Sequence, residues 1–252
     1  MSRERRVDPH VKVLDASVVE RAKARGLDAI VYAPHFTRLP EIRERAARFT
    51  DDDLLVVPAR EVFTGSWRDR KHVLAIGLAE PVPDFLTLDA AMDEFDRQGA
   101  AVLAPHPEFM TVSLTGADLR RYDERVHALE VYNPKHLPSH NRAARRLAAE
   151  ADLPAFGSSY AHLRGTVGEV WTTFEDLEPG EDGLVSALKS GAPRRVERRR
   201  GSAHRLRCAA EFAHLFYENS VEKVDRVVLS GMEATHPLHP VYEGRFDDVA
   251  VY

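Results

Sequence analysis

The stretch GLDAIVYAPHFTRLPEIRERAARFTDDDLLVVPARE, residues 26–61, decides the fold because it holds two apolar runs separated by a segment of helical period. The runs DAIVYAP (28–34) and DLLVVPA (53–59) are continuous and of strand length, which is typical of a sheet covered on both faces. PEIRERAARF (40–49), opened by a proline, predicts a helix between them. Two buried strands joined by a crossover helix form the repeating unit of a parallel α/β sheet.

The same alternation extends in both directions from this stretch. Further strands are expected at 5–13, 72–78, 100–105, 128–133, 154–159 and 169–174. Further helices are expected at 15–26, 87–99, 140–151 and 180–191, some with an N-cap residue at the start or a glycine at the end. About seven or eight strands, mostly separated by helices, predict an α/β fold with a closed or nearly closed TIM-like barrel.

The alternation ends after Gly191. The arginine-dense segment APRRVERRRGSAHRLR follows and leads into an amphipathic pattern at 202–219. We expect a helix there, a second helix around 220–230 and an extended tail. The arginines are interpreted as a solvated linker, with a contact surface for RNA as the alternative. The predicted domains are therefore a barrel at 1–195 and a helical extension with its tail at 196–252.

Composition narrows the class of protein. A chain of 252 residues suits one large α/β domain, and its formal charge of -5 argues against a protein that coats nucleic acid. The single cysteine, Cys208, excludes an internal disulfide and a zinc site built on cysteine pairs. The amino terminus is charged and no run of about 18 apolar residues occurs, so we expect a cytoplasmic protein that does not enter a membrane.

Histidines and one glutamate follow predicted strands, at the end where α/β barrels place functional groups. A lone histidine is more often a hydrogen-bonded packing residue, but several at equivalent strand ends favour a shared site. A hairpin-like return between Glu61 and His72 would bring both to one rim. Imidazole and carboxylate ligands together suit zinc, manganese or iron. The candidate metal ligands are His10, His35, Glu61, His72, His106 and His162.

These residues lie in six short motifs that occur in order along the chain. The motifs are DPHVK (8–12), GLDAI with APH (26–35), VVPARE (56–61), HVL (72–74), APHP (104–107) and GSSYAH with VG (157–168). Their order and spacing resemble the polymerase and histidinol phosphatase (PHP) family over roughly residues 7–195. The resemblance implies a distorted (β/α)7 TIM-like barrel of the PHP type, here with a C-terminal helical appendage. Family members hydrolyse phosphate esters with up to three metal ions.

The resemblance also implies how metal ligands are grouped. The residues that match one family metal site are Glu61, His72 and His106, and His35 and His162 match part of a second. The resemblance therefore implies one or two divalent ions, zinc, manganese or iron, rather than three.

The remaining family site is altered at two positions. It would need His10, Glu61, a second histidine and an aspartate, but Lys12 stands for that histidine and Tyr160 for that aspartate. A protonated lysine has no lone pair for a metal, so we expect the Lys12 ammonium to replace the third ion. A solvent-exposed or carbamate-modified lysine is the alternative. Tyr160 would bind phosphate, ligate a metal or donate a proton, or else fill the vacated site as an aromatic plug.

Three functions follow from these residues. The leading hypothesis is a metal-dependent phosphoesterase for a small phosphate ester or nucleotide, with Lys12 and Arg60 adding positive charge and with Lys12 and Tyr160 as catalytic candidates. The second is a degenerate PHP protein that binds metal or a phosphorylated ligand without turnover, in a regulatory or scaffolding role. The third is an RNA-associated protein, which the acidic net charge disfavours. The sequence leaves the substrate, the metal and the oligomeric state open.

Overall fold

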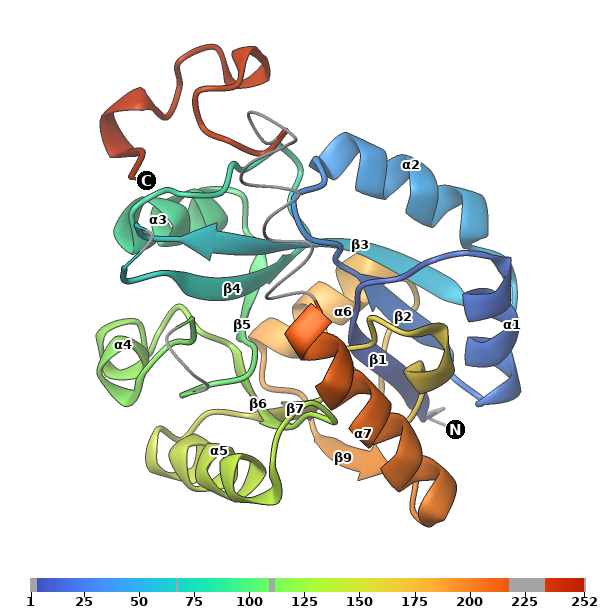
Figure 1. Ribbon diagram of the computed structural model, residues 1–252. Coiled ribbons are helices and arrows are strands. Elements are labelled where there is room, and N and C mark those ends of the chain that lie inside the picture. Colours follow the sequence, from blue (N-terminus) through green and yellow to red (C-terminus); the bar gives the residue numbers. More distant parts are fainter. Residues whose placement is uncertain (1–3, 67, 109–111, 218–233, 252) are drawn as a thin grey trace.

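The fold is built on one nine-stranded sheet, seen in a computed structural model that describes residues 4–66, 68–108, 112–217 and 234–251. The strand order is β7-β6-β5-β4-β3-β2-β1-β8-β9, and the sheet curves into a nearly closed barrel (Figure 1). The strands are β1 (Arg5–Val11), β2 (Ala29–Tyr32), β3 (Leu55–Thr64), β4 (Lys71–Ile76), β5 (Ala101–Ala104), β6 (Ala128–Tyr132), β7 (Ala155–Gly157), β8 (Val170–Phe174) and β9 (Arg194–Arg198).

Strand pairing is parallel in two halves of the sheet, as the alternation of strands and helices predicts. β1, β2 and β3 are parallel, and so are β5, β6 and β7. β4 joins these halves by pairing antiparallel with both β3 and β5, while β8 runs antiparallel to β1 and β9 antiparallel to β8. The predicted α/β barrel is confirmed, and the antiparallel pairs lie where β4 joins the two halves and where β8 and β9 follow β1 in the sheet.

The last strand of the sheet, β9, lies in the arginine-dense segment and packs against β7. A Cβ at Gly157 of β7 would overlap the side chain of Val196 in β9, so glycine is needed for this close approach. Val196 pairs with Thr172 of β8, and Arg195 is held by Glu4 at 2.8 Å. The interpretation of this segment as a linker is therefore wrong, because charges on the outer face hid a strand.

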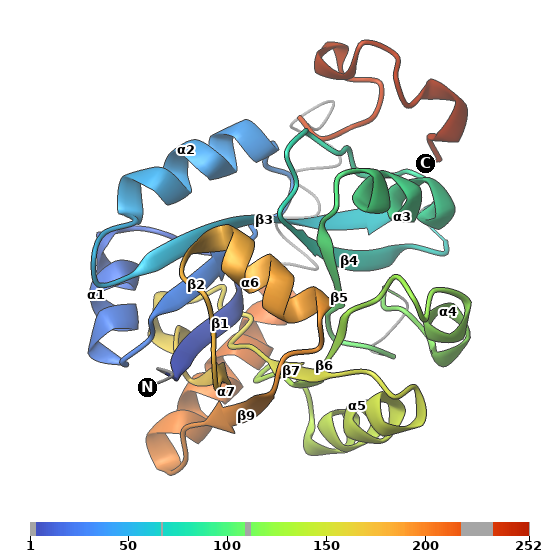
Figure 2. The ribbon, with the colours of Figure 1, turned by 180° about the vertical axis from the view of Figure 1, so that it is seen from behind.

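In the described part of the chain, seven α-helices surround the sheet. They are α1 (Ala16–Ala24), α2 (Leu39–Phe49), α3 (Leu88–Arg97), α4 (Gly116–Arg121), α5 (Pro138–Glu150), α6 (Gly180–Lys189) and α7 (Ser202–Tyr217), with short 3-10 helices at Arg164–Thr166, Pro240–Tyr242 and Asp247–Val249 among the described residues. Seen from behind, α6 lies across one end of the barrel (Figure 2). Its Leu184 and Leu188 pack with apolar side chains such as Val7 and Ala101 at the amino-terminal ends of strands. α6 covers that end, and a site is expected at the opposite end, where the parallel strands finish, which is called the open end.

Local sequence explains several helix boundaries. The side chain of Asp15 accepts a hydrogen bond from the backbone N–H of Val18 at 3.0 Å, which caps the start of α1. Thr87 caps α3 in the same way through Ala90, at 3.2 Å. α2 and α5 each have a proline in the first turn, where the missing N–H costs nothing.

The C-terminal region packs on the barrel in two pieces. α7 agrees with the helix expected at 202–219, while the second expected helix, around 220–230, lies outside the described residues. The tail lies beside α3 and the β3–β4 hairpin (Figure 1), where Tyr242 and Phe246 are buried and the Val251 N–H donates to Phe85. β9 spans the predicted domain boundary at 195, which stays a prediction. Among the described residues, no helix has the length and apolar character needed to cross a bilayer.

Candidate metal centre

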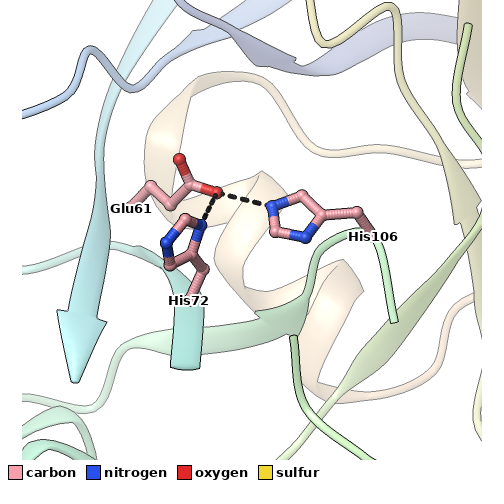
Figure 3. Close-up of side chains that lie close together, drawn as sticks. All are labelled: Glu61, His72 and His106. Carbon is pink, nitrogen blue, oxygen red and sulfur yellow. Dashed lines mark hydrogen bonds and ion pairs between the residues drawn. The ribbon is translucent and has the colours of Figure 1, made fainter. Parts of the chain in front are cut away.

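Three buried side chains from the open end of the barrel form a cluster suited to a metal ion. They are Glu61 of β3, His72 of β4 and His106 just after β5, and their ligand atoms all lie within 4.8 Å of one another (Figure 3). The hairpin of β3 and β4 pairs Phe63 with His72, which puts His72 diagonally across from Glu61 on the same face. Strand pairing thus brings together residues that are eleven positions apart in the chain.

One oxygen of the Glu61 carboxylate faces both histidines of this cluster. Oε1 lies 3.0 Å from Nε2 of His106 and 3.5 Å from Nδ1 of His72. The second ring nitrogen of His106, Nδ1, lies 3.0 Å from the hydroxyl of Ser113. A partner on Nδ1 fixes the orientation of the ring and directs Nε2 toward the carboxylate, which is how proteins usually prepare a histidine ligand.

The other oxygen of Glu61 faces a second group. Oε2 accepts from the Lys12 ammonium at 2.5 Å and lies 2.7 Å from Nε2 of His35 and 3.7 Å from Nε2 of His10. Lys12 also donates to the backbone oxygen of Ala33 at 2.5 Å, and the lysine is only 8% exposed. Lys12 is therefore a buried cation paired with the central carboxylate, which excludes the solvent-exposed alternative.

Tyr160 and His162 line the same region without contacting Glu61. His162 Nδ1 donates to the backbone oxygen of Tyr160 at 2.9 Å, so its lone pair is on Nε2. The His162 ring lies 5.4 Å from the His35 ring, and the Tyr160 ring lies 4.6 Å from that of His10. All eight candidate residues, the six candidate ligands together with Lys12 and Tyr160, thus lie in one region. His162 contacts His35 and Tyr160 rather than Glu61 itself.

Backbone strain accompanies this convergence. Phe36, His106 and Tyr160 all follow strands and have positive φ angles, of 51°, 35° and 43°. Such conformations are unfavourable for residues with a side chain and persist only where surrounding contacts enforce them. Their position at three strand ends around Glu61 is typical of a functional site.

Burial and charge set the protonation of the cluster. Burial raises the pKa of Glu61, but the Lys12 ammonium and the surrounding histidines bring it well below its usual range. Burial lowers the pKa of His72 to about 4 and that of His10 well below its usual value. Burial also lowers the pKa of Lys12 to about 8, an effect that Glu61 opposes. Near neutral pH the site therefore holds a carboxylate at Glu61, neutral imidazoles at His10 and His72, and a mostly charged Lys12.

The donor set fits a divalent ion. Both ring nitrogens of His10 and Nδ1 of His72 are buried and have no hydrogen-bond partner within the described ranges. Buried polar atoms normally find partners, so neutral imidazoles of this kind suggest a missing one. Two imidazoles and one carboxylate match the ligand types that zinc, manganese and iron prefer.

Arg60 does not belong to the site, contrary to the hypothesis that it adds charge there. Its side chain lies on the other face of β3, where it contacts Asp84 at 3.0 Å and donates to the backbone oxygen of Thr37 at 2.8 Å. Successive residues of a strand point to opposite faces, so Arg60 and Glu61 cannot share one site. Strand periodicity at VVPARE would have shown this from the sequence.

Two buried acids that the sequence analysis did not select hold the loops of the site. Glu130 of β6 accepts from the backbone N–H of His106 at 2.7 Å and from the hydroxyl of Ser158 at 2.5 Å. Asp8 of β1 accepts from the backbone N–H groups of Ser159 at 2.9 Å and Gly168 at 3.1 Å. A charged residue inside each apolar strand was the available signal, since such residues are rarely buried without partners.

The appendage also contributes to the site. Glu211 of α7, fully buried, accepts from the backbone N–H of His162 at 3.0 Å and of Leu163 at 2.8 Å. Its other oxygen, Oε2, lies 3.8 Å from the ammonium of Lys135, which in turn lies 4.8 Å from the centre of the Tyr160 ring. No local signal in the helix pattern marks Glu211, because its role depends on where α7 docks.

Comparisons with known proteins agree with this architecture. Residues 138–193 match the family model described as PHP-associated. The uncharacterized protein MJ0417 of Methanocaldococcus jannaschii is 30% identical over 128 residues, which cover 48% of this chain and 52% of that protein. The chain thus spans about half the length of this curated relative.

Solved structures share the fold at low sequence identity. PsfC from Pseudomonas syringae is 20% identical with a TM-score of 0.65, and the match covers 88% of this chain and 100% of PsfC. The lesion-specific endonuclease PfuEndoQ from Pyrococcus furiosus is 14% identical with a TM-score of 0.55, covering 77% of this chain and 58% of the endonuclease. At these identities the likeness concerns the fold.

Proposed function

We infer that this chain, which belongs to the PHP domain family, is a metal-dependent hydrolase of phosphate esters. The observation that carries the proposal is the buried cluster of Glu61, His72 and His106, whose ligand atoms lie within 4.8 Å of one another at the open end of the barrel. A carboxylate and two imidazoles in a preformed arrangement are suited to holding one divalent ion, with zinc, manganese and iron as the candidates.

The chain's own residues prepare this site before any ion binds. Ser113 orients His106, and the β3–β4 hairpin fixes His72 beside Glu61. A divalent ion held there would lower the pKa of a bound water and offset negative charge on phosphoryl oxygens. His35 lies 2.7 Å from the other oxygen of Glu61, and the His162 ring lies 5.4 Å from the His35 ring, so these two histidines are the residues suited to a second ion.

Charge balance favours an anionic substrate. Lys12 pairs with Glu61 at 2.5 Å and Lys135 lies 3.8 Å from Glu211, so these two acids each face one lysine. Burial raises the pKa of the two other buried acids of the site, Asp8 and Glu130, which reduces their negative charge. A divalent ion would therefore leave the mouth of the site with net positive charge. A phosphate ester, small or part of a nucleotide, is the substrate class that such a site attracts.

Lys12 is assigned the part of a fixed cation. Its ammonium contacts Oε2 of Glu61 and the backbone oxygen of Ala33, which leaves its remaining proton for a phosphoryl oxygen. Tyr160 packs between the rings of His10 and His106, at 4.6 and 5.3 Å, with the Lys12 ammonium 5.6 Å from its centre. We assign Tyr160 to shaping the pocket.

Binding without turnover is the second candidate, and the Lys12–Glu61 contact is the observation that favours it. If the ammonium holds the carboxylate too firmly, the site would bind one ion or a phosphorylated ligand and release no product. Turnover of a phosphate ester distinguishes the two functions.

Metal content of the purified, untagged protein tests the proposal. We expect bound divalent ion by mass spectrometry in the wild type, and its loss in Glu61→Gln and His106→Ala. Glu150→Gln and His239→Ala are matched controls, because these residues lie on α5 and in the tail. Retention of helical content by circular dichroism shows that the variants fold. A wild type without metal under replete conditions contradicts the hydrolase proposal.

If metal is present, a panel of phosphomonoesters and phosphodiesters follows. Metal-dependent release of phosphate or alcohol that both site variants lose supports hydrolysis. Metal binding with no turnover of any ester in the panel favours the binding function instead.

A further inference from the structure

Four arginines from three segments gather around one buried glutamate outside the metal centre, and three of them contact its carboxylate. Arg21 and Arg25 lie at the carboxyl end of α1, Arg199 directly follows β9, and Arg207 belongs to α7. Their common partner is Glu169, just before β8, whose side chain is fully buried. The convergence depends on β9 and α7, so it joins the barrel to its C-terminal extension.

The single negative charge of Glu169 cannot neutralise all the guanidinium groups that contact its carboxylate. Its Oε1 accepts from Arg21 at 3.1 Å, from Arg25 at 3.0 Å and from Arg207 at 3.0 Å. Its Oε2 lies 2.9 Å from Nδ1 of His204, so neither oxygen is left for Arg199. A carboxylate has room for about four hydrogen bonds but carries only one negative charge.

Positive charge therefore remains in excess at this place. An open depression of about 510 Å³ lies between α1 and the end of β9, lined by Ser17, Glu20, Arg21, Ala24, Arg25 and Arg199. With Arg207 behind it, four guanidinium groups face the carboxylates of Glu169 and Glu20, which leaves two positive charges uncompensated. The carbonyl groups at the carboxyl end of α1 offset only part of this charge.

Burial and the close spacing of the arginines both lower the pKa values of the Arg21 and Arg25 guanidinium groups. Burial lowers the pKa of Arg21, and the neighbouring charges of Arg25 and Arg207 lower it further. Burial and then the charge of Arg199 lower the pKa of Arg25 in the same way. An additional anion bound among these guanidinium groups would reduce the electrostatic repulsion between them.

Arg199 supplies an independent sign of a missing partner. Its backbone N–H donates to the backbone oxygen of Glu169 at 2.9 Å, which fixes the residue at the cluster. Its side-chain Nε is buried and has no hydrogen-bond acceptor in the described part of the chain. Planar guanidinium groups bind phosphate oxygens through paired hydrogen bonds, so an unfilled N–H beside an open cationic depression fits a phosphate group.

We propose that the depression between α1 and β9 binds the phosphate group of a small phosphorylated anion through Arg21, Arg25 and Arg199. The site is separate from the metal centre, because among the described residues none of its side chains contacts Glu61, His72 or His106. It shares α7 with that centre, since Glu211 on the same helix holds the backbone of His162. A bound anion would fix α7 in place over the open end of the barrel.

Calorimetric titration of sodium pyrophosphate into the full-length protein tests the proposal. We expect one binding site, with affinity weakened about ten-fold or more in both Arg25→Gln and Arg199→Gln, because each removes charge-assisted hydrogen bonds. Arg48→Gln is the matched control, since Arg48 is an exposed arginine of α2 whose partner is Glu44. Arg199→Lys, which keeps the charge but not the planar donors, is expected to weaken binding less than Arg199→Gln.

The metal-site variant Glu61→Gln separates this proposal from the proposed function. Binding of pyrophosphate that persists in Glu61→Gln but fails in both arginine variants supports the second site. Loss of binding in Glu61→Gln, unchanged affinity in folded Arg25→Gln and Arg199→Gln, or no binding to the wild type would each overturn it. Binding of a single-stranded RNA oligonucleotide without binding of pyrophosphate would also overturn the assignment to a small anion.

Discussion

The ammonium of Lys12 lies 2.5 Å from Oε2 of Glu61, while His72 and His106 face the other oxygen of the same carboxylate. One glutamate therefore divides the centre into a side suited to a metal ion and a side that already holds a cation. We expect this division to set how many divalent ions the site can hold.

Replacing Lys12 is expected to change metal stoichiometry. In Lys12→His the ammonium is lost and a neutral imidazole is added beside His10 and His35, so about one further divalent ion should bind per chain. The measurement is metal content by mass spectrometry across a range of free zinc. Lys23→His, in which an exposed lysine paired with Asp51 is changed, is the control. Equal metal content in Lys12→His and wild type would show that Lys12 does not occupy a cation position.

Glu211 is expected to act as a positioning residue for His162. In Glu211→Ala the buried N–H groups of His162 and Leu163 lose their acceptor, which costs about 1–3 kcal/mol of unfolding free energy. Ester hydrolysis should fall, while the ion held by Glu61, His72 and His106 should stay bound because Glu211 contacts none of these three. Metal content and kinetics of the same preparation separate the two effects.

The control for this change is Arg205→Ala, at an exposed position of α7. Rescue of activity by Glu211→Gln, whose amide oxygen still accepts from both N–H groups, is expected. If Glu211→Ala is destabilised but retains full turnover, the position of His162 does not limit the reaction.

Closure of the barrel is expected to depend on Gly157. A methyl group there would overlap Val196 and press on Val170, so Gly157→Ala should lower the free energy of unfolding by about 1–3 kcal/mol. Gly165→Ala is a matched control, because a Cβ at Gly165 meets nothing within 4 Å. Urea unfolding of the two variants checks the difference. Equal stability of both would mean that β9 does not pack tightly on β7.

Docking of the tail is expected to weaken at acid pH. Arg245 of the tail contacts both oxygens of Glu94 in α3, at 2.7 and 2.8 Å. Burial raises the pKa of Glu94, but its partners Arg97, Gln98 and Arg245 bring it below the usual 4.5. The stabilisation is thus present above pH 4.5 and is lost as the pH falls through the lowered pKa of the folded state.

Glu94→Gln tests this dependence on charge. At pH 7 the variant should be less stable than wild type by about 0.5–1 kcal/mol, since Arg245 is partly exposed and the pair is screened by water. At pH 3 the difference should be smaller, because protonation of Glu94 in the wild type increases as the pH falls toward and through its lowered pKa. Urea unfolding at both values gives the comparison, with Glu44→Gln on α2 as the control. The same difference at pH 3 as at pH 7 would rule out a charge effect.

The sequence by itself determined the barrel and the residue types at its open end. Apolar runs such as DAIVYAP specify buried strands, and the helical pattern at 40–49 specifies a helix that packs on them. Both can be read from the sequence, because the spacing of apolar residues within one element is a local property of the chain. His35 and His106 follow such strands directly. A parallel barrel brings strand ends together whatever the details of its packing, so these residues were predictable.

Only the tertiary structure decided which side chains meet and what each one faces. The separation of Lys12 and His106 onto different oxygens of Glu61, the placement of Arg60 on the outer face and the docking of Glu211 on His162 all depend on contacts between distant segments. β9 was missed because its alternation of arginines with Val196 becomes apolar-in and polar-out only when β7 and β8 lie beside it. The local sequence pattern shows whether a segment forms a helix or a strand. Which other segments it packs against is decided by the packing of the whole chain.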